Sequence, residues 1–441
     1  MSKNLSRRAF LGTTGLMAAS LAACGGNGGS SDGGSSEGGE STGAGSVYWL
    51  NFKPELDETA QAVAASYTEQ TGVPVKVVTA ASGTYNQTLL SEMDKTDAPT
   101  LFVIGNAAGV TEWGEYAMDL KGTAIEAELS TDAYNLYDAE GKLVSMGYCY
   151  ECYGIVANAE LIEKAGHSID DIKDFESLKT VAEDIHARAG ELGFDAFVAT
   201  DMDDSSSWRV TGHLANLEYY YEEQDDGGWT ECPAEIKGTY MANYKNIYDL
   251  MINNSIVDPT TLATGGHDPA TQFKNGEAVF FLTGSWDYSD LSAAQPSVKM
   301  IPYYCGVAGE EKAGLNCGTE NCWAVNDFAS DEDKQATIDF MVWLVSDPDA
   351  SAALVEQLGI MPYKNAAEST NGFLNDAAAY TDNGCYVMDW ATNYQPNVDQ
   401  YRAALVSALN AYNSDQSDAN WAAVETAFVG GWATQYAATQ A

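Results

Sequence analysis

The fold class is decided by residues 47–78, which read VYWLNFKPELDETAQAVAASYTEQTGVPVKVV. Residues 47–50 and 73–78 are short apolar runs of the kind that form buried strands. The stretch between them, residues 55–70, has the length and spacing of a helix. A strand, a helix and a second strand in this order predict a crossover between parallel strands, which is the building unit of α/β proteins.

The same alternation continues along the rest of the chain. Further buried strands are expected at residues 101–104, 278–282 and 298–301. Helical spacing recurs at residues 176–192, 234–252, 332–345, 398–412 and 420–436. An α/β fold is therefore expected from residue 47 onward, although periodicity alone does not set the number of lobes.

Residues 1–23 have the features of an export signal, because basic residues precede an apolar run that is too short to span a bilayer. Ser6-Arg7-Arg8-Ala9-Phe10-Leu11 resembles a twin-arginine export motif, and Leu21-Ala22-Ala23-Cys24 resembles the lipobox of bacterial lipoproteins. We expect lipid on Cys24 and a flexible linker over residues 24–46, which are almost all small or polar. The alternative is a plain secretory peptide in which Cys24 is incidental.

The charge of the chain excludes one class of partner. It has 21 basic and 64 acidic residues, for a formal net charge of −43. Such a surface repels the phosphate backbone, so no nucleic-acid partner is expected.

Cysteine spacing predicts neither a metal site nor a cofactor site. Besides Cys24 the chain has seven cysteines, an odd number that allows at most three disulfides. Cys149 and Cys152 have redox or zinc spacing, but no second close Cys or His pair follows them. A local disulfide and a pair of buried thiols both remain open for these two residues.

Several segments, taken in order, resemble the extracellular solute-binding proteins of bacterial ABC importers, in particular the carbohydrate-binding family that includes the maltodextrin-binding proteins. Residues 272–286, QFKNGEAVFFLTGSW, resemble the family's block of helix end, buried strand and Gly-x-Trp turn. Residues 151–158 and 323–326 resemble the segments that pass between the lobes, and residues 359–362 resemble the turn after them. The usual acidic residue of the third strand is replaced by Thr100, and the usual paired glycines before the late tryptophan by residues 320–322.

The resemblance implies a two-lobed, periplasmic-binding-protein-like fold of type II with a ligand cleft between the lobes. Residues 47–149 with 302–346 would form the first lobe, and residues 150–301 with 347–441 the second. A sugar presents flat C–H faces and a rim of hydroxyls, so aromatic platforms and directed polar groups would bind it.

Candidate ligand residues follow from the resemblance and from positions at strand ends and turns. They are Trp286, Glu151, Trp208, Asn106, Asn51, Tyr85 and Tyr394. Trp113 and Trp323 are expected in the core. The four histidines are expected on the surface or in loops rather than in a catalytic triad.

The resemblance implies a monomeric, lipid-anchored binding protein that captures a carbohydrate outside the cytoplasmic membrane and passes it to separate permease subunits. Two alternatives remain open. A secreted carbohydrate-active enzyme would need a pair of catalytic carboxylates, and no pair here has a distinctive context. A binder of ferric ion or another small solute would use adjacent tyrosines, such as residues 219–221 or 303–304.

Overall fold

The computed structural model of the chain describes residues 45–198, 200–203 and 205–440. The expected signal peptide, the lipidation at Cys24 and all but the last two residues of the expected linker lie outside these described residues. The described residues belong to one compact unit, Thr42–Ala441. Within them, no helix is both long enough and apolar enough to cross a bilayer.

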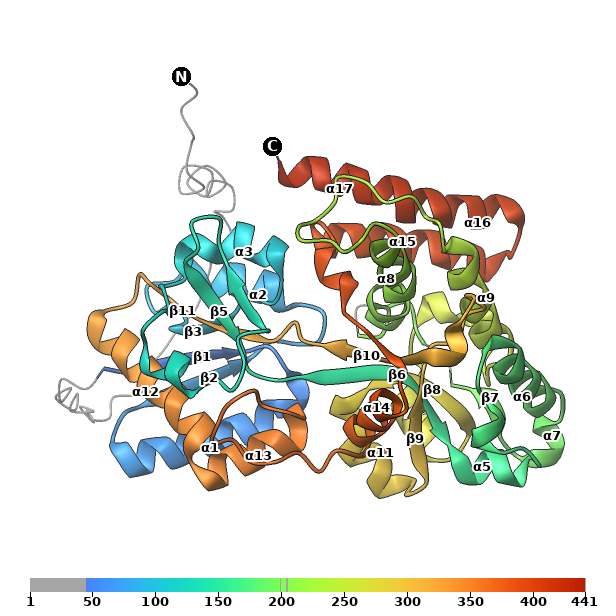
Figure 1. Ribbon diagram of the computed structural model, residues 1–441, viewed down its shortest axis with the longest axis horizontal. Helices are drawn as coiled ribbons and strands as arrows, with labels where there is room; N and C mark the ends of the chain where they lie inside the picture. Colours follow the sequence, from blue (N-terminus) through green and yellow to red (C-terminus); the bar gives the residue numbers. More distant parts are fainter. Residues whose placement is uncertain (1–44, 199, 204, 441) are drawn as a thin grey trace, which may run out of the picture. The chain divides into compact units, whose positions relative to one another are not determined.

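The first sheet confirms the crossover expected from residues 47–78. Its strands run in the order β2-β1-β3-β11-β5-β4. Their bounds are β1 Val47–Asn51, β2 Val75–Thr79, β3 Leu101–Val103, β4 Asn135–Tyr137, β5 Leu143–Gly147 and β11 Cys322–Val325. β1 pairs in parallel with β2 and β3, and helix α1, Asp57–Thr71, is the connection that packs against β2 (Figure 1).

The second sheet is also mixed. Its strands run in the order β12-β10-β6-β8-β7, and β9 pairs with β6 as well. Their bounds are β6 Glu151–Asn158, β7 Asp195–Phe197, β8 Ala278–Gly284, β9 Val298–Ile301, β10 Ala313–Gly318 and β12 Tyr386–Met388. All residues of β6 and β8 are buried, which accounts for their unbroken apolar character in the sequence. The α/β class is therefore confirmed, with two six-stranded sheets.

Strand β10 had not been expected, and it affects where the chain passes between the sheets. β10 pairs with β6 in the second sheet, so the return to the first sheet falls between Gly318 and Cys322, later than the expected boundary at residue 302. Helix α13, Pro348–Leu358, contacts α1 and α12, Asp331–Ser346, and also the short turn Ser285–Asp287 that follows β8. The residue ranges of the two lobes stay a prediction.

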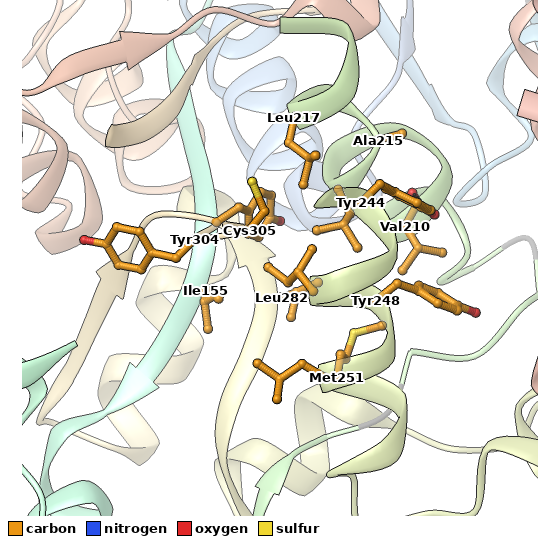
Figure 2. Packing of buried hydrophobic residues seen from close by; sticks show 14 of the residues in the cluster. Ile155, Val210, Ala215, Leu217, Tyr244, Tyr248, Met251, Leu282, Tyr304 and Cys305 are labelled. Atoms are coloured by element: carbon orange, nitrogen blue, oxygen red, sulfur yellow. Dashed lines mark hydrogen bonds between the residues drawn. The ribbon is translucent and has the colours of Figure 1, made fainter. Parts of the chain in front are cut away.

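Each sheet has its own buried core and its own helices. The helices that contribute to the core of the first sheet are α1, α2 Tyr85–Met93, α3 Ala107–Trp113, α4 Ala124–Glu128, α12 and α13. Around the second sheet lie α5 Ala159–Lys164, α6 Phe175–Ala187, α7 Ala189–Leu192, α8 Asn216–Asp225, α9 Met241–Asn253, α10 Pro269–Lys274, α11 Tyr288–Ala294, α14 Gly372–Asp382, α15 Val398–Ser414, α16 Asp418–Glu425 and α17 Gly431–Thr439. Figure 2 shows part of this second core, where Tyr244 and Tyr248 of α9 lie near Leu282 of β8.

Two expected helices differ in extent, for reasons visible in the backbone. The helix expected over residues 234–252 begins only at Met241, because Gly238 has a φ of 71° that a helix does not allow. The helix expected over residues 420–436 is interrupted by a π-helical turn, Thr426–Gly430, before α17. The other long helices follow their expected ranges within a few residues.

Candidate functional site

A cavity of about 400 Å³ lies where strands of both sheets end. From the first sheet it is lined by residues that follow β1, β2 and β3, and from the second by residues that follow β8 and precede α15. The start of β6 and the link from β10 to β11 complete the lining. Its volume suits a small organic ligand, and its position at strand ends is where α/β folds place ligand sites.

Tryptophan side chains dominate the second-sheet side of the cavity. Trp286 belongs to a short 3₁₀ turn, Ser285–Asp287, directly after β8, and its ring centroid lies 5.9 Å from that of Trp208. Trp390 comes from the link between β12 and a 3₁₀ turn, Ala391–Tyr394. Trp286 and Trp208 are each half-buried, so part of each ring is open to a ligand. Flat, partly exposed rings are what the C–H face of a sugar ring packs against.

A buried ion pair belongs to the lining of the cavity. Lys53 Nζ lies 2.8 Å from Glu151 Oε1 and 3.2 Å from Glu55 Oε1. Asn321 Nδ2 donates to the other oxygen of Glu151 at 3.0 Å. Burial disfavours the charged Lys53 amine, but the carboxylates of Glu151 and Glu55 outweigh burial and raise its pKa. Burial raises the pKa of the Glu151 carboxyl, although Lys53 acts in the opposite direction. Both oxygens of Glu151 are hydrogen-bonded within the protein, one to Lys53 and one to Asn321.

His213 lies at the centre of the aromatic side, not on the surface as expected. It is 7 % exposed and belongs to a π-helical turn, Arg209–Leu214, a conformation that recurs at functional sites. Its ring stacks on Tyr153 at 4.1 Å between centroids and lies 5.3 Å from Trp286. Burial lowers the pKa of His213 well below its usual range, with Arg402, Arg209 and Lys53 adding to the effect. The imidazole is therefore neutral, with one N–H and one lone pair.

Three buried nitrogens on cavity residues have no hydrogen-bond partner among the described residues: His213 Nδ1, Trp390 Nε1 and Trp113 Nε1. A buried polar atom without a partner costs free energy, about 1–3 kcal/mol each. Trp113 was expected in the core, and it is 4 % exposed and also lines the cavity.

The structure brings five of the seven expected site residues into the cavity lining and leaves two outside. Those in the lining are Trp286, Trp208, Glu151, Asn106 and Tyr85.

Asn51 and Tyr394 lie outside the lining, although both were expected to contact ligand. The Asn51 side chain is fully buried and holds the turn after β1, where it accepts from the Lys53 N–H and donates to the Lys53 carbonyl. The Tyr394 hydroxyl donates to the carbonyl of Trp229. Both are committed to internal hydrogen bonds.

Sequence reasoning missed Lys53, His213, Trp390 and Arg402, which all line the cavity. Lys53 follows the first strand by two residues, so its position at a strand end was a usable signal. His213 lies inside a helical segment and carried no signal. Asn321, from a segment that departs from the family pattern, also lines the cavity.

Two of the tyrosines considered for iron, Tyr219 and Tyr221, form hydrogen bonds with other tyrosines, whereas the buried Tyr303 hydroxyl has no partner among the described residues. The hydroxyls of Tyr219 and Tyr401 lie 2.9 Å apart, and those of Tyr221 and Tyr386 lie 2.8 Å apart. Burial raises the pKa of Tyr219 and of Tyr221, which opposes the phenolate that ferric ion requires. Among the described residues, no group of three His, Cys, Asp or Glu side chains is placed to hold a metal ion.

All seven cysteines in the described part of the chain are free thiols, so the two alternatives for Cys149 and Cys152 resolve to buried thiols. Burial raises the pKa of Cys149 and of Cys152 well above the usual range. Neither thiol is therefore a reactive thiolate.

Comparison with solved structures shows the same fold. The SBP RafE in complex with raffinose aligns with a TM-score of 0.67 and 16 % identity, covering 90 % of this chain and 100 % of that one. A chitin oligosaccharide binding protein aligns at 0.67 and 13 %, covering 89 % and 100 %. Maltose-bound MalE3 of T. maritima aligns at 0.64 and 17 %, covering 89 % and 99 %.

The family follows from the sequence itself. No curated protein matches the chain. The profile of the family described as "Bacterial extracellular solute-binding protein" matches residues 62–381, which is more than half of the chain. The chain therefore belongs to the bacterial extracellular solute-binding proteins, and it binds a solute rather than catalysing a reaction.

Proposed function

We propose that the chain captures an oligosaccharide in the tryptophan-lined cavity and delivers it to the permease of an ABC importer. Membership of the family makes the chain a solute-binding component of such an importer. The observation that carries the choice of ligand is the pair of half-buried rings, Trp208 and Trp286, in the lining of a cavity of about 400 Å³. Each platform that buries about 100 Å² of ring contributes about 2.5 kcal/mol.

The ligands named for the aligned structures also support an oligosaccharide as the solute. RafE was solved with raffinose, MalE3 with maltose, and a third relative in fold is described as binding chitin oligosaccharide. Because identity to these proteins is below 20 %, they support the class of ligand and not a particular sugar.

The cavity is placed to couple binding to closure. Its lining comes from both sheets, and Asn86 of α2 lies 3.5 Å from Asp399 of α15 across its edge. A ligand that contacts both sides stabilises the arrangement in which they approach each other. A permease that recognises this arrangement would accept loaded protein in preference to empty protein.

Anchoring by lipid at Cys24 would complete this function. It would hold the binding domain at the outer face of the cytoplasmic membrane, near its permease. The length and composition of residues 24–46 suit a tether.

A thermal-shift screen of the full chain against neutral and acidic mono- and oligosaccharides tests the proposal. A ligand at 100 times its Kd stabilises the folded state by about 2.7 kcal/mol, which is a readily measured shift. At least one oligosaccharide should raise the midpoint, and ferric citrate should not. A shift with iron and none with any sugar would favour the ferric alternative, and sustained release of reducing ends would favour an enzyme.

A further inference from the structure

The cations in the described lining are Lys53 and Arg402, and the two are arranged differently. Arg402, in the first turns of α15, lines the cavity and is half-buried. Its guanidinium lies flat against Gly212, since a β-carbon added to Gly212 would come within 2.7 Å of Nη2 and 2.8 Å of Cζ. The absence of a side chain at Gly212 lets the guanidinium approach the π-helical turn that carries His213.

A buried hydrogen-bond chain fixes the direction of Arg402. Arg402 Nε donates to Gln395 Oε1 at 2.8 Å. Gln395 is fully buried, and its Nε2 donates to the Thr211 carbonyl at 2.9 Å and to the Tyr219 hydroxyl at 3.1 Å. Tyr219 and Tyr401 continue the chain, and the Tyr401 hydroxyl donates to the Phe428 carbonyl. The Nε edge of the guanidinium is thus held by protein.

No carboxylate compensates the charge of Arg402. Among the described residues, no Asp or Glu oxygen lies within 4.0 Å of its guanidinium, although acidic residues outnumber basic ones by 64 to 21. By contrast, Lys53 pairs with Glu151 at 2.8 Å, and the nearby Arg209 lies 3.9 Å from Asp287. The guanidinium of Arg402 is therefore open to a counter-charge supplied by a ligand.

The charged groups that act on His213 are also positive. The three charged groups that lower the pKa of His213, beyond the larger effect of burial, are Arg402, Arg209 and Lys53. All three are cations, in a chain with a net charge of −43. Beside them His213 Nδ1 has no partner among the described residues.

Carboxylates also line the cavity, but among the described residues none of them lies within 4.0 Å of the Arg402 guanidinium. Glu55 and Glu151 are paired with Lys53. Glu112 and Asp399 are exposed, where water and salt screen their charges, and Glu320 is half-buried.

We propose that the corner formed by Arg402 and His213 binds a carboxylate of the solute, so that the captured oligosaccharide is an acidic one containing uronic acid. The inference rests on the proposed function, since it names the class of sugar that the same cavity takes. The planar fork of arginine matches a carboxylate with two parallel hydrogen bonds, and the neutral imidazole adds a donor beside it. The rest of the sugar ring would pack on the tryptophans.

The test uses matched ligands. Oligogalacturonate, alginate oligomers and hyaluronan fragments are titrated into the full chain by calorimetry, each beside the same oligosaccharide after chemical reduction of its carboxylates to alcohols. At least one acidic oligosaccharide should bind, and its reduced counterpart should bind at least tenfold more weakly. Equal or tighter binding of the reduced form would overturn the inference.

Two variants locate the effect. Arg402→Gln should weaken the acidic oligosaccharide at least tenfold and change its reduced counterpart less than threefold. Lys312→Gln removes a charge from an exposed lysine outside the cavity lining and should change neither. Equal loss for both ligands in Arg402→Gln would mean that Arg402 only supports the fold of the site. Binding of neutral sugars alone would contradict this inference and leave the proposed function standing, whereas binding of no sugar would contradict both.

Discussion

Gly284 lies directly beneath the ring of Trp286. A β-carbon added to Gly284 would come within 2.2 Å of two carbons of the indole, a distance that no real contact allows. The glycine ends β8 with a φ of −129°, so its conformation is open to any residue and the constraint is space alone. Strand β8 therefore positions Trp286 through the absence of a side chain two residues earlier.

Gly284→Ala should displace the Trp286 ring and weaken sugar binding by more than tenfold, without removing any group that touches the sugar. The backbone accepts alanine, so the far-ultraviolet circular dichroism should stay unchanged. Gly190→Ala is the matched control, because nothing lies within 4 Å of a β-carbon there. Unchanged affinity in Gly284→Ala would show that the position of the Trp286 ring does not matter for binding.

Lys53→Met should lower the free energy of unfolding by about 3–5 kcal/mol, because it leaves the Glu151 carboxylate buried without its partner. The two side chains are 5 % and 2 % exposed. Urea denaturation measures the loss, and the double variant Lys53→Met, Glu151→Leu should recover most of it by removing both charges. A double variant no more stable than Lys53→Met would contradict the pairing.

Glu218 makes the stability of the fold depend on pH. It is fully buried in α8, and burial raises its pKa well above the usual range, with the neighbouring Glu222 adding to the shift. Glu222 itself accepts from the backbone N–H groups of Lys237 and Gly238.

Because the folded-state pKa of Glu218 is raised, its contribution is fully present below the unfolded value of about 4.3 and is lost as pH rises through the folded value. Glu218→Gln should therefore be more stable than the unmodified chain at pH 8, by an amount that shrinks toward pH 4. Glu183→Gln, at an exposed position of α6, should show no such dependence. Chemical denaturation across this pH range measures both, and a gain for Glu218→Gln that did not change with pH would contradict the raised pKa.

Cys24→Ser should release the protein from the membrane fraction of cells that export it and abolish labelling by radioactive fatty acid. Cys385→Ser, at a half-buried cysteine of the folded part, should remain membrane-bound and labelled. Membrane-bound, labelled Cys24→Ser would show that the anchor lies elsewhere.

The features that could be predicted are those that depend on residues close together in the sequence. The crossover from β1 to β2 follows from local apolar spacing, and Trp286 follows from its fixed distance after β8. β10 was missed because Ala313–Gly318 contains two glycines and an asparagine, which local preference assigns to a turn. It is a strand because β6 and β12 supply backbone partners on both sides.

Residues that meet only through the fold could not be predicted. His213 and Arg402 lie far apart in the sequence, and their neighbourhood exists only because Gly212 lets the guanidinium approach. Glu151 was expected to face sugar hydroxyls, and its pairing with Lys53 and Asn321 depends on segments from three parts of the chain. Positions at strand ends therefore predicted where the cavity lies. They did not predict which of its side chains are free to bind a ligand and which are used in internal contacts.

The proposed function depends on a sugar binding against the ring of Trp286. Calorimetric titration of the tightest oligosaccharide from the screen into Trp286→Ala tests it, beside Trp343→Ala, which truncates an equally half-buried tryptophan of α12 outside the cavity lining. We expect a loss of affinity greater than tenfold in Trp286→Ala and less than threefold in Trp343→Ala, with both variants folded. Equal affinity of Trp286→Ala and the unmodified chain would contradict it.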